Sequence, residues 1–218
     1  MRYQEARVVG SLLDRISPDT CINLGSGNIS QLRLKKPWIE QFIFVPLQSR
    51  GVNIIHTDLV ISDGVDLKID LSSEEDLRKL EQTGNSRVFL LCNVLEHVPS
   101  ALRAVIINSV TSIMTQLDYL IVTVPFRYPY HADPIDTGYR PSATELSRVI
   151  GLNVTYAQTV SAGNFREELL MMTPAKRLRK ILKPLYPFQK LNKYRENLSR
   201  LQFLFKNYEI TIVAAQRK

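Results

Sequence analysis

The sequence predicts an α/β fold built on a mostly parallel, doubly wound sheet. Runs rich in Val, Ile and Leu recur along the 218 residues, each bounded by turn residues, and helical patterns lie between them. The clearest runs lack the alternation of a strand that has one face in water, as expected where helices cover both faces of a parallel sheet. A repeated order of strand and helix is typical of doubly wound folds.

The individual strands and helices follow from local composition. Seven segments are expected to form strands: 21–24, 52–56, 65–71, 88–92, 119–124, 153–160 and 208–214. A helix should begin at Ser72-Ser73-Glu74-Glu75, where a serine can cap the first turn and the acids favour its positive end. A second helix should span about 100–116, and a third should follow Pro141-Ser142 and stop at Gly151.

The positive charge of the chain is concentrated in one segment. The net charge is +7, but residues 174–206 contain ten basic residues and one acid. This segment therefore carries +9, and the rest of the chain carries −2. The length suits one domain. We expect a single domain over residues 1–218, with a basic amphipathic helical insertion at about 166–206, before the last strand.

Hydrophobic residues recur at helical spacing within the basic segment. One stripe consists of Leu178, Ile181, Leu182 and Leu185, and a second consists of Leu191, Tyr194, Leu198 and Leu201. Pro184 and Pro187 separate the two predicted helices. Three interpretations remain open: a solvated lid over a substrate, contact with an anionic membrane surface through residues 174–206, and nucleic-acid binding. Nucleic acid is favoured least, because no aromatic-interleaved motif accompanies the basic residues.

The sequence shows no signal for a membrane span or for secretion. No apolar run approaches the roughly 18 residues that a span needs, and residues 1–10 carry charges where a signal peptide needs an apolar centre. We therefore expect a cytoplasmic protein, peripheral at the inner membrane face if the basic segment binds lipid. The two cysteines, Cys21 and Cys92, show no metal-ligand spacing, and we expect no metal site.

Residues that follow the strands are candidates for ligand binding, because ligands of open parallel sheets bind beyond the carboxyl ends of the strands. The first strand leads into Asn23-Leu24-Gly25-Ser26-Gly27-Asn28, whose two glycines allow a tight turn and a close approach to a ligand. Asp58 and Asp70 follow two further strands and can accept hydrogen bonds from ribose hydroxyls and an adenine amino group. Because Ile29 stands where a further glycine is expected, a nucleoside without a pyrophosphate is favoured.

The order of motifs extends this interpretation along the chain. The glycine loop and the acid after the second strand are followed by VDLKIDL, LCNVLEHV, VTVPFRYPYHADPIDTGYRPSATEL and YEITIVAAQRK. Together these motifs resemble the class I S-adenosylmethionine-dependent methyltransferases, in particular small bacterial and archaeal ones, over residues 19–162 and the last strand. The resemblance implies a Rossmann-like, mostly parallel sheet of seven strands with the last strand antiparallel, in one methyltransferase domain.

The resemblance also implies S-adenosyl-L-methionine as the cofactor and assigns residues to it by position. They are Asn23, Gly25, Ser26 and Gly27 for the methionine end and ribose, Asp58 with the adjacent Leu59 for the ribose hydroxyls, Asp70 with Leu71 for the adenine, and Asn93 with Val94 near the sulfonium. Three positions depart from the family pattern. Ile29 replaces a third glycine, Asn23 replaces an acid, and Gln116-Leu117-Asp118 replaces a glycine-rich turn.

Methyl transfer from a sulfonium has a neutral leaving group, so positioning and exclusion of water dominate the protein's contribution. An oxygen or nitrogen nucleophile can also need a general base. His131, Asp133 and Asp136 lie in the loop expected to face the sulfonium, and His131 is the natural base because imidazole titrates near pH 6.5. His97 is a second candidate. The expected acceptor is a small molecule, a sugar or glycan, or a lipid-linked molecule.

Each of these assignments has a structural alternative. The alternatives are a plain turn at Gly25 and Gly27, helix caps at Asp58 and Asp70, a bracing role for Glu96 and His97, and an internal ion pair between Asp136 and Arg140. For the whole protein, the alternative is a non-catalytic binding or scaffolding module that keeps the fold. A nucleic-acid methyltransferase is favoured less, because the chain outside the basic segment is slightly acidic.

Overall fold

The computed structural model describes residues 1–130, 136–170, 172–182 and 191–217, and within them seven strands form one sheet. The strands are β1 (Thr20–Leu24), β2 (Asn53–Asp58), β3 (Leu67–Lys68), β4 (Arg87–Cys92), β5 (Tyr119–Arg127), β6 (Asn153–Asn164) and β7 (Asn207–Gln216). Their order is β3-β2-β1-β4-β5-β7-β6. The first five strands pair in parallel, and β7 runs antiparallel to both β5 and β6. The seven-stranded sheet with an antiparallel last strand is therefore confirmed.

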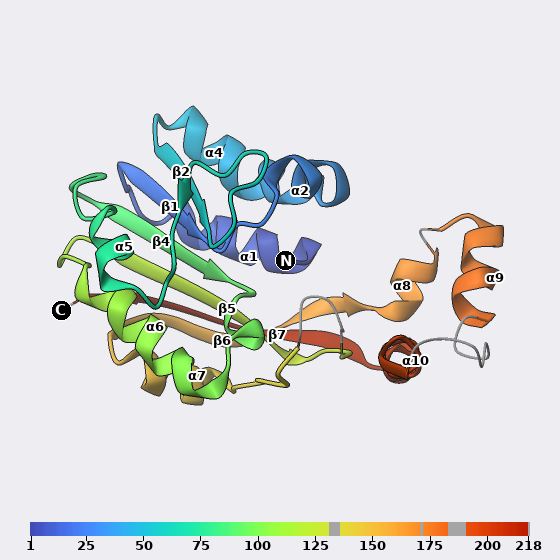
Figure 1. Ribbon diagram of the computed structural model, residues 1–218. Helices are drawn as coiled ribbons and strands as arrows, with labels where there is room; N and C mark the ends of the chain where they lie inside the picture. The colour runs from blue at the N-terminus through green and yellow to red at the C-terminus, as the bar shows by residue number, and fades with distance from the viewer. Residues whose placement is uncertain (131–135, 171, 183–190, 218) are drawn as a thin grey trace.

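Helices cover both faces of this sheet (Figure 1). One face carries α1 (Tyr3–Leu13), α2 (Ile29–Lys35), α3 (Pro37–Ile39), the π-helical turn η1 (Glu40–Phe44) and α4 (Val45–Ser49), and the other carries α5 (Glu74–Arg78), α6 (Ser100–Ser112) and α7 (Ala143–Ile150). Successive residues of β4 show the two layers. Val88 and Leu90 belong to the core beneath α1 and α4, whereas Phe89 and Leu91 belong to the core beneath α6 and α7.

The helix boundaries follow the capping signals in the sequence. The Ser73 side chain accepts the first-turn N–H of Asp76, and Ser142 and Glu145 form a reciprocal capping box at the start of α7. Helix α7 ends at Gly151, whose φ of 68° is left-handed, as expected for a glycine that terminates a helix. Helix α6 ends four residues before the expected position 116, because the N–H of Thr115 donates to the carboxylate of Asp118.

Two parts of the N-terminal half differ from expectation. Helices α1 to α4 have no counterpart among the expected elements. Strand β3 pairs through Leu67 and Lys68 alone, although residues 65–71 were expected to form it. The N–H groups of Asp66 and Ile69 still donate to the carbonyls of His56 and Asp58, so backbone contact with β2 continues one residue beyond each end of the regular pairing. Asp66 Oδ2 also accepts the N–H of His56, and Asp70 Oδ1 accepts the N–H of Ser72.

A buried ion pair joins β4 to β5 at the amino ends of the strands. Arg87 and Asp118 are 1% and 0% exposed, and the guanidinium Nη2 lies 2.6 Å from Asp118 Oδ2. The guanidinium also donates to the carbonyl oxygens of Leu80, Glu81 and Ile113. Asp118 belongs to the turn that departs from the family pattern. It fixes the start of β5 at the amino edge of the sheet, opposite the carboxyl ends of the parallel strands.

The basic segment forms helices that stand apart from the sheet. We call α8 (Phe165–Leu170), α9 (Pro174–Leu182) and α10 (Leu191–Leu201) the helical arm. Strands β6 and β7 extend past their neighbours and carry this arm, and the 3-10 turn η4 (Gln202–Leu204) leads from α10 into β7 (Figure 1). The two predicted helices are present as α9 and α10, whereas Pro184 and Pro187 lie outside the described residues. In the described ranges, no helix is long and apolar enough to cross a membrane.

Candidate functional site

The glycine loop after β1 is fixed to the end of β2. Gly25 and Gly27 have φ values of 66° and 65°, a left-handed conformation that glycine adopts without strain. The N–H of Gly27 donates to Asp58 Oδ2 at 2.8 Å, and the N–H of Ser26 donates to the carbonyl of Thr57 at 2.9 Å. The structure thus brings together the glycines and the carboxylate that the sequence placed after adjacent strands.

The surroundings of the two glycines differ. A Cβ atom on Gly25 would lie 2.7 Å from Val94 Cγ2, whereas nothing lies within 4 Å of the corresponding position on Gly27. A side chain at Gly25 would therefore clash with Val94, whereas the Cβ direction of Gly27 is open. Ile29, at the position of the missing third glycine, is buried and packs against Gly64, so this position serves the core and the start of α2.

Asn23 is less accessible to a ligand than the glycine loop is. It is buried in β1, and its Nδ2 donates to Nδ1 of His56 at 3.0 Å. His56 packs edge-on against Phe44, and burial lowers the pKa of its imidazole. The hydrogen bond between Asn23 and His56 therefore holds β1 against β2. It requires a neutral imidazole, because Nδ1 of His56 accepts the bond.

The residues that the resemblance assigns to the adenine, Asp70 and Leu71, have local contacts of their own. Oδ1 of Asp70 accepts from the N–H and the hydroxyl of Ser72, and Oδ2 has no hydrogen-bond partner among the described residues. Leu71 is buried in the core, and Leu59 is exposed. One carboxylate oxygen of Asp70 thus stabilises the turn at Ser72, and the other can accept a hydrogen bond from a ligand.

The loop after β4 contains a strained residue held by a buried acid. Asn93 has a φ of 56°, which is uncommon for a residue other than glycine and often marks a functional site. Its Nδ2 donates to Oε1 of Glu5 at 2.7 Å, and the Thr123 hydroxyl donates to the same oxygen at 2.6 Å. Glu5 is fully buried, and its Oε2 accepts the N–H of Arg2. Helix α1 therefore reaches the ends of β4 and β5.

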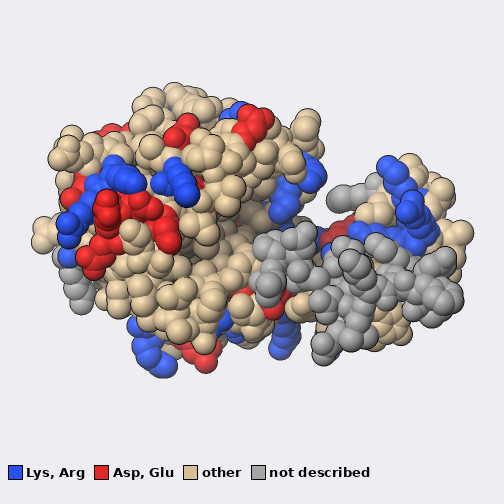
Figure 2. Space-filling view, in the orientation of Figure 1, with Lys and Arg blue, Asp and Glu red and all other residues tan. Residues whose placement is uncertain are grey.

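A cavity of about 910 Å³ lies beside this group. The start of α1, including Glu5, forms one wall, and Asn93, Glu96 and His97 from the loop after β4 form another. The helical arm contributes Glu168 and Arg200. Figure 2 shows the surface hollowed between the body and the arm. Of the residues predicted for the cofactor, Asn93 lines this cavity, whereas the glycine loop, Asp58 and Asp70 do not.

Glu96, for which the sequence left a bracing role beside His97 as an alternative to chemistry, has the surroundings of a catalytic acid or base. It lies in the 3-10 turn η2 (Leu95–His97), is 1% exposed, and its Oε2 has no hydrogen-bond partner among the described residues. Burial raises the pKa of its carboxyl to about 7, and the nearby Glu5 also raises it, while Arg140 lowers it. An acid that titrates near neutrality in a cavity wall is suited to proton transfer.

The predicted catalytic residues lie in different surroundings. His97 lines the cavity, with Nε2 3.8 Å from Oε1 of Glu96. Asp136 is buried, accepts the N–H of Gly138 and forms an ion pair with Arg140. This is the internal ion pair that the sequence offered as the structural alternative to catalysis. His131 and Asp133 lie outside the described residues. Within the described part of the chain, no group of three His, Cys, Asp or Glu side chains is placed to hold a metal ion.

The start of α1 also ties the helical arm to the body. Arg2 pairs with Glu168 of α8 at 2.6 Å, donates to the carbonyl of Ala162, and lies over the ring of Tyr208. Burial alone would raise the pKa of Glu168, but the hydrogen bonds and charges of Arg2 and Lys180 lower it below its usual value. One acid thus joins α1, α8 and α9 along the wall of the cavity.

Comparisons with known proteins concern the fold. No protein-family model matches the chain, and no curated protein matches its sequence. A SAM-dependent methyltransferase from Archaeoglobus fulgidus aligns with a TM-score of 0.53 and 14% identity, over 97% of this chain and 94% of that one. A SAM-dependent methyltransferase from Anabaena variabilis gives 0.58 and 10%, over 97% and 84%.

A third solved structure is the 1,6-didemethyltoxoflavin-N1-methyltransferase of Burkholderia thailandensis with bound S-adenosylhomocysteine. It aligns with a TM-score of 0.53 and 10% identity, over 99% of this chain and 78% of that one. At such identities the likeness concerns the arrangement of helices and strands. The chain has the class I S-adenosylmethionine-dependent methyltransferase fold.

Proposed function

We propose that the protein is an S-adenosylmethionine-dependent methyltransferase whose acceptor is a small molecule, a sugar or glycan, or a lipid-linked molecule. The observation that carries the proposal is the contact of Gly27 with Asp58, which fixes a glycine loop to a carboxylate at the carboxyl edge of the sheet. Ligands of open α/β sheets bind at this edge. The fold shared with solved methyltransferases supports the proposal.

The residues at this edge fit the cofactor. The open space beside Gly27 leaves room for a nucleoside, and a carboxylate has about four lone-pair sites, so Asp58 can hold Gly27 and still accept from ribose hydroxyls. Oδ2 of Asp70 suits the amino group of an adenine. Because Ile29 takes the place of a third glycine, there is no extended glycine bed for a diphosphate, and the cofactor needs none.

The proposed chemistry divides between positioning and proton transfer. When bound, S-adenosylmethionine supplies an electrophilic methyl group on a positively charged sulfur. Glu5 holds Asn93 in its left-handed conformation at the border between the glycine loop and the cavity, which fixes the site before the ligands bind. Glu96 would accept the proton of an acceptor hydroxyl or amine, because its pKa of about 7 allows it to be a carboxylate at neutral pH. His97 would act beside it.

The cavity sets the range of acceptors. Its volume of about 910 Å³ lies within the roughly 300–1,000 Å³ of small-molecule sites. Its walls combine aromatic side chains, Trp38 and Tyr128, with charged ones such as Glu168 and Arg200. This mixture suits a polar acceptor that carries rings or hydroxyl groups. The helical arm forms one wall of the cavity.

Isothermal titration of the full chain with S-adenosylmethionine and S-adenosylhomocysteine tests the proposal. Binding of either compound is the expected result, and ATP is the control, because the loop is not built for a triphosphate. If neither nucleoside binds and neither raises the melting temperature, the proposed function is wrong.

A non-catalytic binding or scaffolding role is the competing proposal. It is favoured by the position of Val94, which fills the space beside Gly25 where the methionine end of the cofactor is expected to run. The same titration separates the two roles, since a scaffold that has lost its cofactor binds neither compound. Restoring space with Val94→Ala should strengthen binding if Val94 alone restricts the loop, and should change nothing in a scaffold.

A further inference from the structure

Helix α9 contacts the rest of the protein through its basic side chains. Arg177 donates to the carbonyl oxygens of Leu169, Leu170 and Met172, at 2.9, 3.2 and 3.4 Å. Lys180 lies 3.3 Å from the carboxylate of Glu168 and over the ring of Phe165. These two residues lie three positions apart, so they occupy one side of the helix. The side turned toward the protein is therefore polar and charged.

The apolar side of α9 is turned outward. Leu178, Ile181 and Leu182 are 59%, 42% and 48% exposed, and no residue of α9 is buried. At 100° per residue Leu178 and Leu182 fall on the side away from Arg177 and Lys180, whereas Ile181 lies at its edge, about 40° from Arg177. An amphipathic helix that packs on its own protein normally buries this face. In α9 the usual arrangement is reversed.

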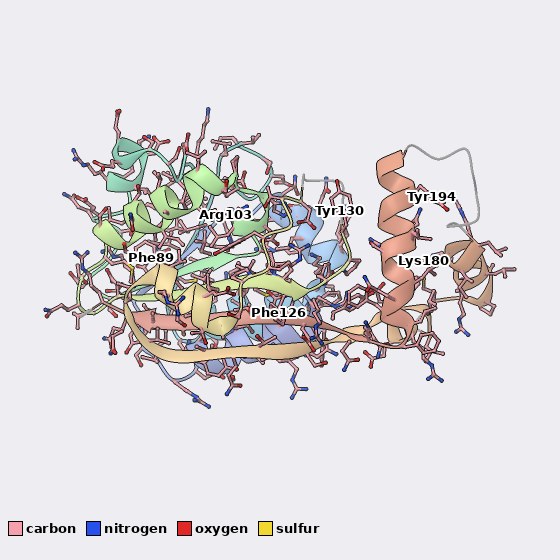
Figure 3. The ribbon with its side chains drawn as sticks, turned by 90° about the horizontal axis from the view of Figure 1, so that it is seen from below. Phe89, Arg103, Phe126, Tyr130, Lys180 and Tyr194 are labelled. Carbon is pink, nitrogen blue, oxygen red and sulfur yellow. The ribbon has the colours of Figure 1, made fainter. Side chains whose placement is uncertain are left out.

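Positive charge borders the exposed apolar face. Arg179 is exposed about 60° from Leu182, whereas the exposed Lys176 lies on the opposite side of α9, and the helix contains no acid. On the face of the molecule seen in Figure 2, blue and red side chains are mixed over the body, whereas blue side chains dominate on the described part of the arm. Figure 3 shows from a second direction that the arm, with Lys180 and Tyr194, stands beyond the end of the sheet. The apolar side chains of α9 are thus partly exposed on a part of the molecule that lies beyond the end of the sheet (Figure 3).

We infer that the outward face of α9 docks on an anionic phospholipid surface. An exposed apolar stripe with Lys and Arg beside it is the pattern of helices that lie in the plane of a membrane interface. A lid over the cavity would turn the leucines inward, and a nucleic-acid site would turn Arg177 and Lys180 outward; the observed orientation is the opposite in both cases. This inference does not depend on the proposed methyl transfer.

Sedimentation of the full chain with vesicles tests the inference. Vesicles of phosphatidylcholine mixed with phosphatidylglycerol should carry the protein down at low salt, and pure phosphatidylcholine should carry down much less. Each basic residue near an anionic surface contributes about 1 kcal/mol, which is roughly fivefold in the partition coefficient. Arg179→Glu should therefore lower binding to the anionic vesicles at least fivefold, and higher salt should remove much of the wild-type binding.

Leu178→Asn tests the apolar contribution with a close control. Leu117, in the turn before β5 at the other end of the sheet, is also 59% exposed. Leu178→Asn should lower binding to anionic vesicles by roughly fivefold, the effect of about 1 kcal/mol of lost apolar burial. Leu117→Asn should leave binding unchanged, and so should Arg148→Glu on α7, an exposed control for charge reversal. All four variants should keep the wild-type melting temperature, because none changes a buried residue.

Three results would overturn the inference. The first is binding that Leu117→Asn and Leu178→Asn reduce equally, which would mean a non-specific attraction of a basic protein. The second is a concentration-dependent dimer, seen by analytical ultracentrifugation, that Leu178→Asn abolishes, since a second copy would then cover α9. The third is an absence of binding to anionic vesicles at low salt. Each result leaves the nucleoside titration unaffected, so failure here is distinct from failure of the proposed function.

Discussion

The carboxylate of Glu5 lies 2.7 Å from the side-chain nitrogen of Asn93, and this contact joins the first helix to the loop after the fourth parallel strand. The same oxygen accepts the hydroxyl of Thr123. Because Glu5 is fully buried, each of these bonds is shielded from water and costly to lose. A residue 88 positions away in the sequence thus fixes the strained backbone at the edge of the cavity.

Glu5→Ala should destabilise the protein and loosen this edge. It leaves the Thr123 hydroxyl without its buried acceptor, which costs about 1–3 kcal/mol, and it leaves Asn93 Nδ2 with only the longer hydrogen bond to the Thr123 oxygen. Urea unfolding should show the loss, and S-adenosylhomocysteine should bind more weakly, because Asn93 is no longer held. Glu75→Ala, an exposed acid in the first turn of α5, is the control and should change neither property. Unaltered stability of Glu5→Ala would show that the contact with Asn93 contributes nothing.

Asp118→Ala should be more damaging than any exposed substitution in the chain. It leaves the guanidinium of Arg87 buried without its counter-charge, and breaking a buried pair in this way typically costs about 3–5 kcal/mol. Glu74→Ala provides the contrast, because Glu74 and Arg78 form an exposed pair at 3.8 Å, and such pairs contribute less than about 0.5 kcal/mol. Equal denaturation midpoints for the two variants would contradict the structural role of Asp118.

Asp58→Ala should weaken cofactor binding more than it weakens the fold. If Asp58 accepts from the ribose, the dissociation constant of S-adenosylhomocysteine should rise at least tenfold, about 1.4 kcal/mol. The loss of the two exposed hydrogen bonds from Gly27 and Val60 should reduce stability by about 0.5 kcal/mol each, the low end of the usual range. Titration calorimetry and urea unfolding measure the two effects. Asp63→Ala, an exposed acid in the following loop, should bind normally, and normal binding by Asp58→Ala would remove Asp58 from the site.

The sheet could be predicted from the sequence because its central strands are buried on both faces. Residues such as Val88 and Leu90 on one face and Phe89 and Leu91 on the other give an uninterrupted apolar run. Helix α1 does carry a helical pattern, since Ala6, Val9, Leu12 and Leu13 recur at helical spacing on its buried face, although the charged Glu5 lies on that face too. Between α3 and α4 the π-helical turn η1 shifts the spacing, so the helical period is lost there.

The candidate site was predictable where it depends on neighbouring strands. Gly27 follows β1 and Asp58 ends β2, and because these strands pair in parallel, the two residues meet at the same edge of the sheet. The position of Glu5 beside Asn93 depends instead on how α1 packs, which no local pattern specifies. The perturbed acid Glu96 is visible in the sequence as part of LCNVLEHV, but its burial, and therefore its pKa, is a property of the folded chain.

The pKa of Glu96 has a direct consequence for stability. In the unfolded chain its carboxyl titrates near 4.5, and burial in the folded protein raises this pKa to about 7. Between these two values the folded protein binds a proton that the unfolded chain has released. The contribution of Glu96 therefore lowers the free energy of unfolding as the pH rises from about 4.5 to about 7, with no further change above that range.

Glu96→Gln removes this dependence and keeps the shape of the side chain. A shift from 4.5 to about 7 corresponds to about 3 kcal/mol, so the variant should gain this amount relative to wild type between pH 4.5 and pH 8. Urea unfolding of both proteins across the range measures the difference, in which the other titrating groups cancel. The backbone contacts of Thr137 with the Glu96 carbonyl are unchanged by the substitution, and Glu75→Gln, exposed on α5, should show no pH-dependent difference. If Glu96→Gln parallels wild type at every pH, the carboxyl of Glu96 titrates normally and is not the base that methyl transfer to a hydroxyl or amine would use.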